Sequence, residues 1–190
     1  MDAQAQAVID FWFGVPPSTE PRAAWFKKDA AFDGEIRSRF GSAVESALAG
    51  GLREWDAAPA GTLARILLLD QFTRNIFRDT ARAFAGDAFA FAAAQGLVAR
   101  GADRLLDPLQ RQFVYLPFEH AEGRAAQAES LRPFVGLGAE HPKLAGLEVW
   151  AKKHADIIER FGRFPHRNAL LGRESTAEEV EFLRQPGSSF

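Results

Sequence analysis

Two short segments of the chain concentrate arginine, asparagine and other hydrogen-bonding side chains. The first Arg-Asn segment runs over residues 70–78, and the second Arg-Asn segment runs over residues 161–173. A guanidinium group is planar and always charged, and its N–H donors match the paired oxygens of a carboxylate or a phosphate. Together the segments predict a polar cleft that binds an anionic small molecule or a peptide carboxylate.

The first segment is predicted to lie on a central, buried helix, because apolar residues fall on two sides of it near its start. Asp70, Arg74 and Arg78 recur every four residues and share one stripe, so that Asp70 can orient Arg74. Gln71 and Asn75 complete the polar set on this helix. An exposed stripe with a weak ion pair would give the same spacing.

The second segment surrounds a predicted break in a helix. Its polar side chains are Arg163, His166, Arg167, Asn168 and Arg173. Gly162 and Pro165 end the preceding helix and predict an ordered turn. In one interpretation, Arg163 and Arg167 clamp an anion at this turn. In the other, the arginines cap carbonyl groups at helix ends and pair with glutamates of the next helix.

Four further residues are candidates for proton transfer in such a cleft. They are Glu119, His120, His154 and His166. An imidazole changes its charge near neutral pH, which suits it to this role. His154 lies at the centre of an apolar helix stripe, where a satisfied core histidine is an alternative. Tyr115 is a further candidate for ligand binding. The residues leave open whether the protein is an enzyme.

The spacing of possible metal ligands argues against a metal centre. Glu119 and His120 are adjacent, whereas carboxylate-bridged sites in helical bundles use Glu-x-x-His pairs. The sequence has no His-Glu-x-x-His motif and no cysteine that could bind zinc. It also has no glycine-rich phosphate loop and no Gly-x-Ser-x-Gly elbow. We therefore predict no metal and no cofactor.

Composition narrows the class of protein. Of the 190 residues, 47% are hydrophobic, which excludes a disordered chain. A net charge of −2 gives no general attraction to nucleic acid or to an anionic membrane, and no apolar run is long enough to span a bilayer. Residues 1–6 do not resemble the start of a signal peptide. We expect a cytoplasmic protein without nucleic-acid or membrane partners.

Helix signals dominate the chain, so we predict an all-α protein with a single domain over residues 1–190. Expected helices cover residues 2–13, 30–49, 63–77, 83–100, 108–117, 118–131, 142–161 and 177–183. Asp29 and Thr62 are the expected N-caps of two of them, Pro117 is expected to interrupt another, and Ser175 to Glu178 is expected to form a capping box. About seven or eight helices with short connections predict antiparallel hairpins, arranged as a tetratricopeptide-like solenoid or a compact orthogonal bundle.

Several strings in the sequence resemble the bacterial domain-of-unknown-function 924 family. They are Phe11–Phe13, Trp25–Phe26, Leu68–Arg78, Leu116–Glu122, Phe161–Asn168 and Leu171–Thr176. The resemblance extends from Val8 to Leu183. It implies a helical, tetratricopeptide-like fold and no established activity. Thr73 stands where the family usually has proline, which favours an unbroken helix.

Two functional hypotheses follow from these residues. In the first, Arg74, Arg78, Arg163 and Arg167 clamp an anionic ligand in a cleft lined by arginine, histidine and asparagine. In the second, the chain is a scaffold that binds a protein partner on a concave helical surface. The Arg-Asn segments then form a structural hydrogen-bond network that holds the helices together.

Overall fold

The structure is a computed structural model that describes residues 1–189, and this range is helical without any strand. The α-helices are α1 (Ala3–Phe13), α2 (Ala30–Leu48), α3 (Pro59–Ile66), α4 (Thr73–Ile76), α5 (Asp87–Ala99), α6 (Pro108–His120), α7 (Arg124–Glu140), α8 (Leu147–Phe161) and α9 (Ala177–Leu183). A π-helical segment, η3 (Leu67–Phe72), joins α3 to α4 in one continuous helix. The described residues therefore form eight separate helices, which confirms the predicted all-α class and number.

Single 3-10 turns connect many of these helices. They are η1 (Ala23–Trp25), η2 (Arg53–Ala57), η4 (Ala81–Phe84), η5 (Ala102–Leu105), η6 (Pro142–Leu144) and η7 (Pro165–Arg167). No helix in the described part of the chain is both long and apolar enough to cross a membrane.

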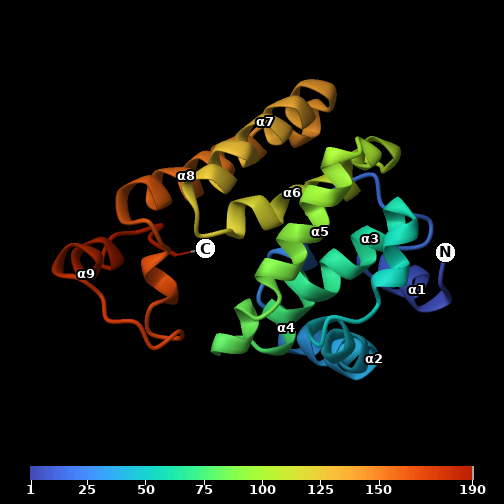
Figure 1. Ribbon diagram of the computed structural model, residues 1–190, viewed down its shortest axis with the longest axis horizontal. Helices are drawn as coiled ribbons and strands as arrows, with labels where there is room; N and C mark the ends of the chain where they lie inside the picture. The colour runs from blue at the N-terminus through green and yellow to red at the C-terminus, as the bar shows by residue number, and fades with distance from the viewer. Residues whose placement is uncertain (190) are drawn as a thin grey trace.

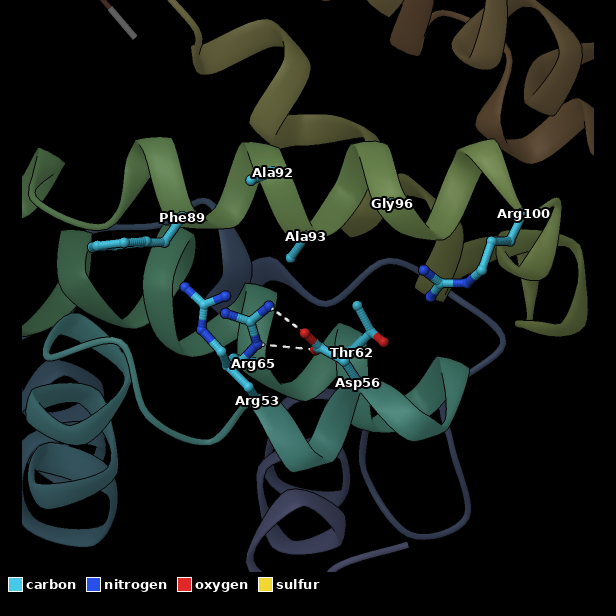
Figure 2. Close-up of a pocket in the computed structure, with 9 residues that line it drawn as sticks. All are labelled: Arg53, Asp56, Thr62, Arg65, Phe89, Ala92, Ala93, Gly96 and Arg100. Atoms are coloured by element: carbon cyan, nitrogen blue, oxygen red, sulfur yellow. Dashed lines mark hydrogen bonds and ion pairs between the residues drawn. The ribbon is translucent and has the colours of Figure 1, made fainter.

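The continuous helix from α3 to α4 lies in the middle of the N-terminal helices (Figure 1). α3 packs against α1, α5 and α6, and α2 packs against η3 and α4. α7 and α8 form a long hairpin that extends from α6, and α9 lies beyond the end of α8 (Figure 1). A polar pocket remains between η2, α3 and α5 (Figure 2).

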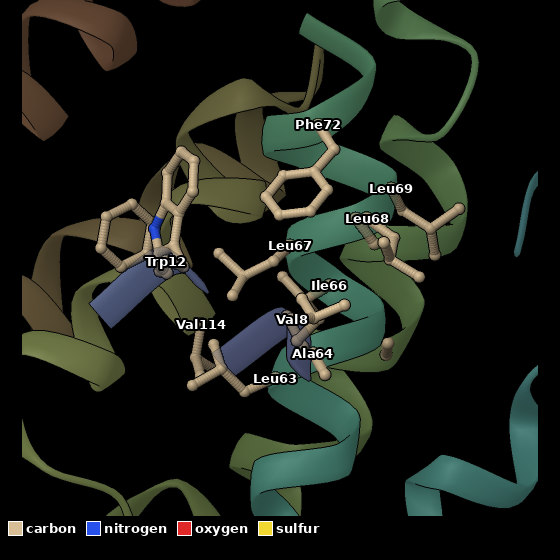
Figure 3. Close-up of a cluster of buried hydrophobic side chains, with 14 of the residues drawn as sticks. Val8, Trp12, Leu63, Ala64, Ile66, Leu67, Leu68, Leu69, Phe72 and Val114 are labelled. Atoms are coloured by element: carbon tan, nitrogen blue, oxygen red, sulfur yellow. The ribbon is translucent and has the colours of Figure 1, made fainter. Parts of the chain in front are cut away.

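The core is built around α3 and η3, as the two-sided apolar pattern of this helix predicts. Leu63, Leu67 and Phe72 have no exposed surface, and Trp12 of α1 packs on Phe72 with ring centroids 5.4 Å apart (Figure 3). A helix that is apolar around its circumference must be enclosed by other elements. Polar groups on this helix are therefore withdrawn from water and depend on partners inside the protein.

The helix that carries the first Arg-Asn segment widens into a π-helix, where an unbroken α-helix was expected. Such insertions are rare and are frequent at functional sites. The hydroxyl of Thr73 donates to the carbonyl oxygen of Leu69 at 2.8 Å, so it satisfies one acceptor within the widened segment. Gly86 lies so close to Leu69 that an added Cβ would collide with this oxygen and lie 2.8 Å from the carbonyl carbon. This contact places the start of α5 against η3.

Several predicted helix ends differ from the structure. Asp29 caps α2 as predicted, because its carboxylate accepts from the amides of Ala31 and Phe32. Thr62 is not an N-cap: α3 begins at Pro59 after Ala58, since proline is well suited to the first helical position.

Two predictions in the C-terminal half were also wrong. Pro117 lies inside α6, which continues to His120, and the break falls after that residue. The last capping box is formed by Thr176 and Glu179, one residue later than expected. In each case the helical period was read correctly and the boundary was placed at the wrong residue.

Gly86 offers a direct test of the close approach between α5 and η3. We expect Gly86→Ala to lower the free energy of unfolding by roughly 2–3 kcal/mol, because the new methyl group overlaps backbone atoms of Leu69. Gly34→Ala in α2 is the matched control, since nothing lies within 4 Å of its added Cβ, and it should stabilise by about 0.5–1 kcal/mol. Urea unfolding measures both. An unchanged midpoint for Gly86→Ala would contradict the packing described here.

Candidate functional site

Asp70, in η3, is the centre of a buried group of polar side chains. Its side chain has no exposed surface. It accepts hydrogen bonds from Nδ1 of His120 and Nε2 of Gln71, both at 2.6 Å, and Nη1 of Arg74 lies 3.2 Å away. Burial alone would raise the pKa of Asp70, but the charge of Arg74 and the bond with His120 hold it well below its usual value. Asp70 is therefore ionised, and Nδ1 of His120 carries the donated proton.

Asp87 joins the two Arg-Asn segments. Its carboxylate accepts from Nη1 and Nη2 of Arg74 at 2.8 and 3.1 Å, and from Nη1 of Arg167 at 3.0 Å. It occupies the first position of α5, where the helix dipole favours a negative charge. Asp87 was not predicted as a site residue, because the helix was expected to begin four residues earlier, with this residue in its interior.

Arg167 is a buried cation, with 5% of its surface exposed. Its guanidinium lies over the rings of Phe84 and Phe164, 4.6 Å from each centroid. Nε is buried and has no hydrogen-bond partner among the described residues. Burial, reinforced by the positive charge of Arg74, lowers the pKa of Arg167 to about 10 although Asp87 opposes the shift.

The three histidines singled out from the sequence lie close to this group. The ring centroids of His120 and His154 are 6.1 Å apart, and Phe164 lies 5.6 Å from His154 and 5.7 Å from His166. Burial lowers the pKa of His120, and lowers that of His154 to about 3 and that of His166 to about 4. All three imidazoles are therefore neutral at pH 7.

Glu119 adds a buried carboxyl group beside His154. Its Oε2 lies 3.4 Å from Nδ1 of His154, which also lies 2.9 Å from the carbonyl oxygen of Trp150 and donates to it. Burial and the negative charge of Asp70 raise the pKa of Glu119 to about 8. At neutral pH this side chain is mostly a neutral carboxylic acid, which can donate a hydrogen bond.

We call Asp70, Arg74, Asp87, His120 and Arg167 the central cluster. Its two carboxylates and two guanidiniums balance in formal charge, and its imidazole is neutral. His120 resembles the base of an acid–base pair, since Asp70 holds one ring nitrogen and the other remains for a reacting group. Within residues 1–189 no three histidine, cysteine or acidic residues are grouped so that they could hold a metal ion.

Asn75 and Arg78 lie outside the central cluster, on the α2 side of α4. Asn75 donates to Oδ1 of Asp33 at 2.7 Å, and Arg78 binds both oxygens of Asp33 at 2.8 Å. Arg78 does not share a helix face with Asp70 and Arg74 as predicted, because α4 ends at Ile76. These bonds tie the end of the central helix to the start of α2.

Three polar residues of the second segment hold the C-terminal part of the chain together. Arg163 binds both oxygens of Glu179 on α9 at 2.7 and 2.8 Å, and Asn168 donates to Ser175 at 3.0 Å. Arg173 binds both oxygens of Glu122 at 2.6 and 2.9 Å. This pairing with glutamates is the structural alternative that the sequence left open for the segment.

Tyr115 points to another part of the molecule. Its hydroxyl donates to Oδ2 of Asp103 at 2.7 Å, and its ring packs edge-on against Phe134 at 5.7 Å. Burial and the hydrogen bond with Asp103 raise its pKa. Tyr115 therefore joins α6 to η5 and α7, and it makes none of the contacts that define the central cluster.

Comparison with known proteins matches residues 8–187 to the family described as bacterial protein of unknown function (DUF924). Among solved structures, the chain is similar to the protein of unknown function ATU0120 from Agrobacterium tumefaciens. The two are 43% identical with a TM-score of 0.82, over 95% of this chain and 97% of that chain. No curated protein gives a match. The family resemblance predicted from the sequence is confirmed, and the chain belongs to the bacterial DUF924 family of unknown function.

Proposed function

We propose that the protein binds a small anionic ligand at the central cluster, with Arg167 as the principal contact. The observation that carries this proposal is the buried Nε of Arg167, which has no hydrogen-bond partner among the described residues. An unsatisfied buried donor is costly, and in native proteins it calls for an explanation such as a missing ligand. A carboxylate or phosphate oxygen would supply the missing acceptor.

The charges around Arg167 also favour an anion. Among the described residues, Arg167 pairs with Asp87 alone and shares this carboxylate with Arg74, which also pairs with Asp70. The pKa of about 10 indicates that the surroundings of Arg167 do not fully compensate its charge. A bound anion would bring an acceptor to the unsatisfied Nε of Arg167, and the neutral imidazoles of His120 and His166 would offer hydrogen bonds without adding charge.

The proposed clamp is smaller than the four arginines named from the sequence. Arg78 and Arg163 each bind both oxygens of a carboxylate, Asp33 and Glu179 respectively. A guanidinium engaged in this way is already neutralised. Arg74 likewise binds both oxygens of Asp87. We therefore assign ligand binding to Arg167 and a structural role to Arg74, Arg78 and Arg163. Two other expectations from the sequence, binding of a protein partner on a concave surface and a cytoplasmic location, remain predictions.

Proton transfer is a second candidate function, favoured by the bond between Asp70 and His120. The distance of 2.6 Å is typical of a strong, charge-assisted hydrogen bond. A carboxylate bound to one ring nitrogen fixes the tautomer and makes the other nitrogen a better base. His120 would then remove a proton from a ligand held by Arg167, whereas a simple binding protein would not need this pair.

Ligand binding at Arg167 can be tested by thermal unfolding with a panel of small carboxylates. An anion present at 100 times its Kd stabilises the folded state by about 2.7 kcal/mol, which corresponds to a rise of roughly 5–10 °C in Tm. We expect Arg167→Lys to lose most of this shift, because lysine keeps the charge but lacks Nε. Arg132→Lys, at an exposed position on α7, is the control and should retain the shift. Equal shifts in both variants would exclude Arg167 as the contact.

The coupling of Asp70 to its neighbours can be measured by NMR titration of the His120 imidazole and the Glu119 carboxyl group. The negative charge of Asp70 opposes the burial that lowers the pKa of His120, and it adds to the burial that raises the pKa of Glu119. We therefore expect Asp70→Asn to lower both pKa values, in protein that remains folded by circular dichroism. Asp33→Asn removes a carboxylate outside the central cluster and should leave both groups unchanged. A His120 titration that is the same in wild type and Asp70→Asn would argue against the pair.

Glu119 predicts a specific dependence of stability on pH. Its pKa in the folded protein, about 8, is above its ordinary value of 4.5, so wild-type protein loses stability as pH rises through this interval. Glu119→Gln mimics the neutral acid and does not titrate. Relative to wild type, the variant should gain on the order of 3 kcal/mol between pH 5 and pH 9.

Chemical denaturation across this pH range measures the effect of Glu119→Gln. Glu129→Gln changes an exposed glutamate of α7 and is the matched control, for which we expect a nearly constant difference from wild type. If the difference for Glu119→Gln is equally constant, the carboxyl group of Glu119 is ionised throughout and the burial argument fails.

A further inference from the structure

We propose that the pocket between η2, α3 and α5 is a second binding site, specific for a phosphate group. Three guanidiniums, from Arg53, Arg65 and Arg100, line this pocket together with the single carboxylate of Asp56. Three positive charges and one negative charge leave a formal surplus of two positive charges. The pocket shares no lining residue with the central cluster, so this proposal does not rest on the proposed function.

The pocket has room for a small ligand. Its volume is about 190 Å³, below the roughly 300–1,000 Å³ of pockets that enclose drug-sized molecules. Ala93 and Gly96 of α5 form part of its wall, and the methyl group of Ala93 and the absence of a side chain at Gly96 leave the space open (Figure 2). A phosphate group with a small organic substituent fits this size better than a nucleotide or a peptide.

Arg65 is the fixed element of the pocket. Only 6% of its surface is exposed, and its Nε and Nη2 bind the two oxygens of Asp56 at 2.9 and 2.5 Å. Its Nη1 makes no hydrogen bond among the described residues. The pairing with Asp56 holds the guanidinium in one orientation, so one donor remains in a fixed position beside the pocket.

Arg53 and Arg100 provide charge that no carboxylate neutralises within the described residues. Arg53 donates only from Nε, to the carbonyl oxygen of Gly50 at 3.2 Å, and Arg100 makes no ion pair. Figure 2 shows the guanidiniums of Arg53 and Arg65 next to each other, with Arg100 reaching back along α5 from the opposite side. An oxyanion bound between these three guanidiniums would reduce the repulsion between their positive charges.

The arrangement favours phosphate over a carboxylate. Guanidinium groups approach the pocket from two sides, and a phosphate presents three or four oxygens that can accept from both sides at once. A carboxylate has two oxygens, which one guanidinium can already occupy. Phe89 lies at one end of the pocket, where its ring can pack against an apolar substituent of a phosphomonoester (Figure 2).

Isothermal titration calorimetry at constant ionic strength tests the site with two probes, inorganic phosphate and phenyl phosphate. We expect saturable binding of both to wild type. Arg53→Gln and Arg100→Gln, at exposed positions, should each raise the Kd about tenfold, as expected for loss of a charge-assisted hydrogen bond. Arg132→Gln makes the same change of charge on α7 and should leave the Kd unchanged. Phe89→Ala should weaken phenyl phosphate by roughly threefold and spare inorganic phosphate.

Three results would overturn the proposal. The first is the absence of saturable phosphate binding to wild type. The second is equal weakening by Arg132→Gln and Arg100→Gln, which would indicate general electrostatic attraction. The third is binding that is lost in Arg167→Lys and retained in the Arg53 and Arg100 variants, which would place the anion at the central cluster. If inorganic phosphate binds as predicted but Phe89→Ala does not weaken the binding of phenyl phosphate, the phosphate site is supported. The ring of Phe89 then has no role in it.

Discussion

The ionised carboxylate of Asp70 imposes the strongest constraint on this structure, because it has no contact with water. An isolated charge in a protein interior is very unfavourable, so its partners must be present whenever the chain is folded. Arg74 comes from the same helix, while His120 comes from α6, 50 residues later. Burial of one charge therefore fixes the end of α6 against the π-helical segment. Glu119, the residue before His120 in α6, is thereby brought close to Asp70, and burial together with this negative charge keeps it neutral.

A second constraint is steric and acts on the neighbouring carboxylate. The first turn of α5 can approach η3 only because Gly86 has no side chain. That approach sets Asp87 beside Arg74, and Asp87 then holds Arg167 of the second segment. A backbone contact on one side of the cluster and a buried charge on the other thus bring together residues that are distant in the sequence.

These two constraints explain which features the sequence could predict. The central helix, its apolar surroundings and the pairing of Asp70 with Arg74 follow from helical spacing, which is a local property. The partnership of Arg74 with Asp87 depends on where α5 begins, and spacing alone misplaced that start. The widening of η3 leaves no signal in the pattern of apolar residues, since every residue of that segment is buried. The contact of Arg167 with Asp87 spans 80 residues and required the fold.

Arginine-rich segments serve structure and binding by the same chemistry, so residue type alone does not separate the two roles. In this chain, a donor or a charge without an internal acceptor indicates a candidate for binding. Arg78, Arg163 and Arg173 each bind both oxygens of a carboxylate, and they join elements of the fold. Arg167 has a buried donor without an acceptor, and Arg53 and Arg100 face a pocket without a carboxylate of their own. Arginines that are paired with a carboxylate stabilise the folded protein, whereas arginines with an unsatisfied donor or an unpaired charge destabilise it in the absence of an anion. Sites in this family of helical proteins are therefore best sought where the internal pairing of charges is incomplete.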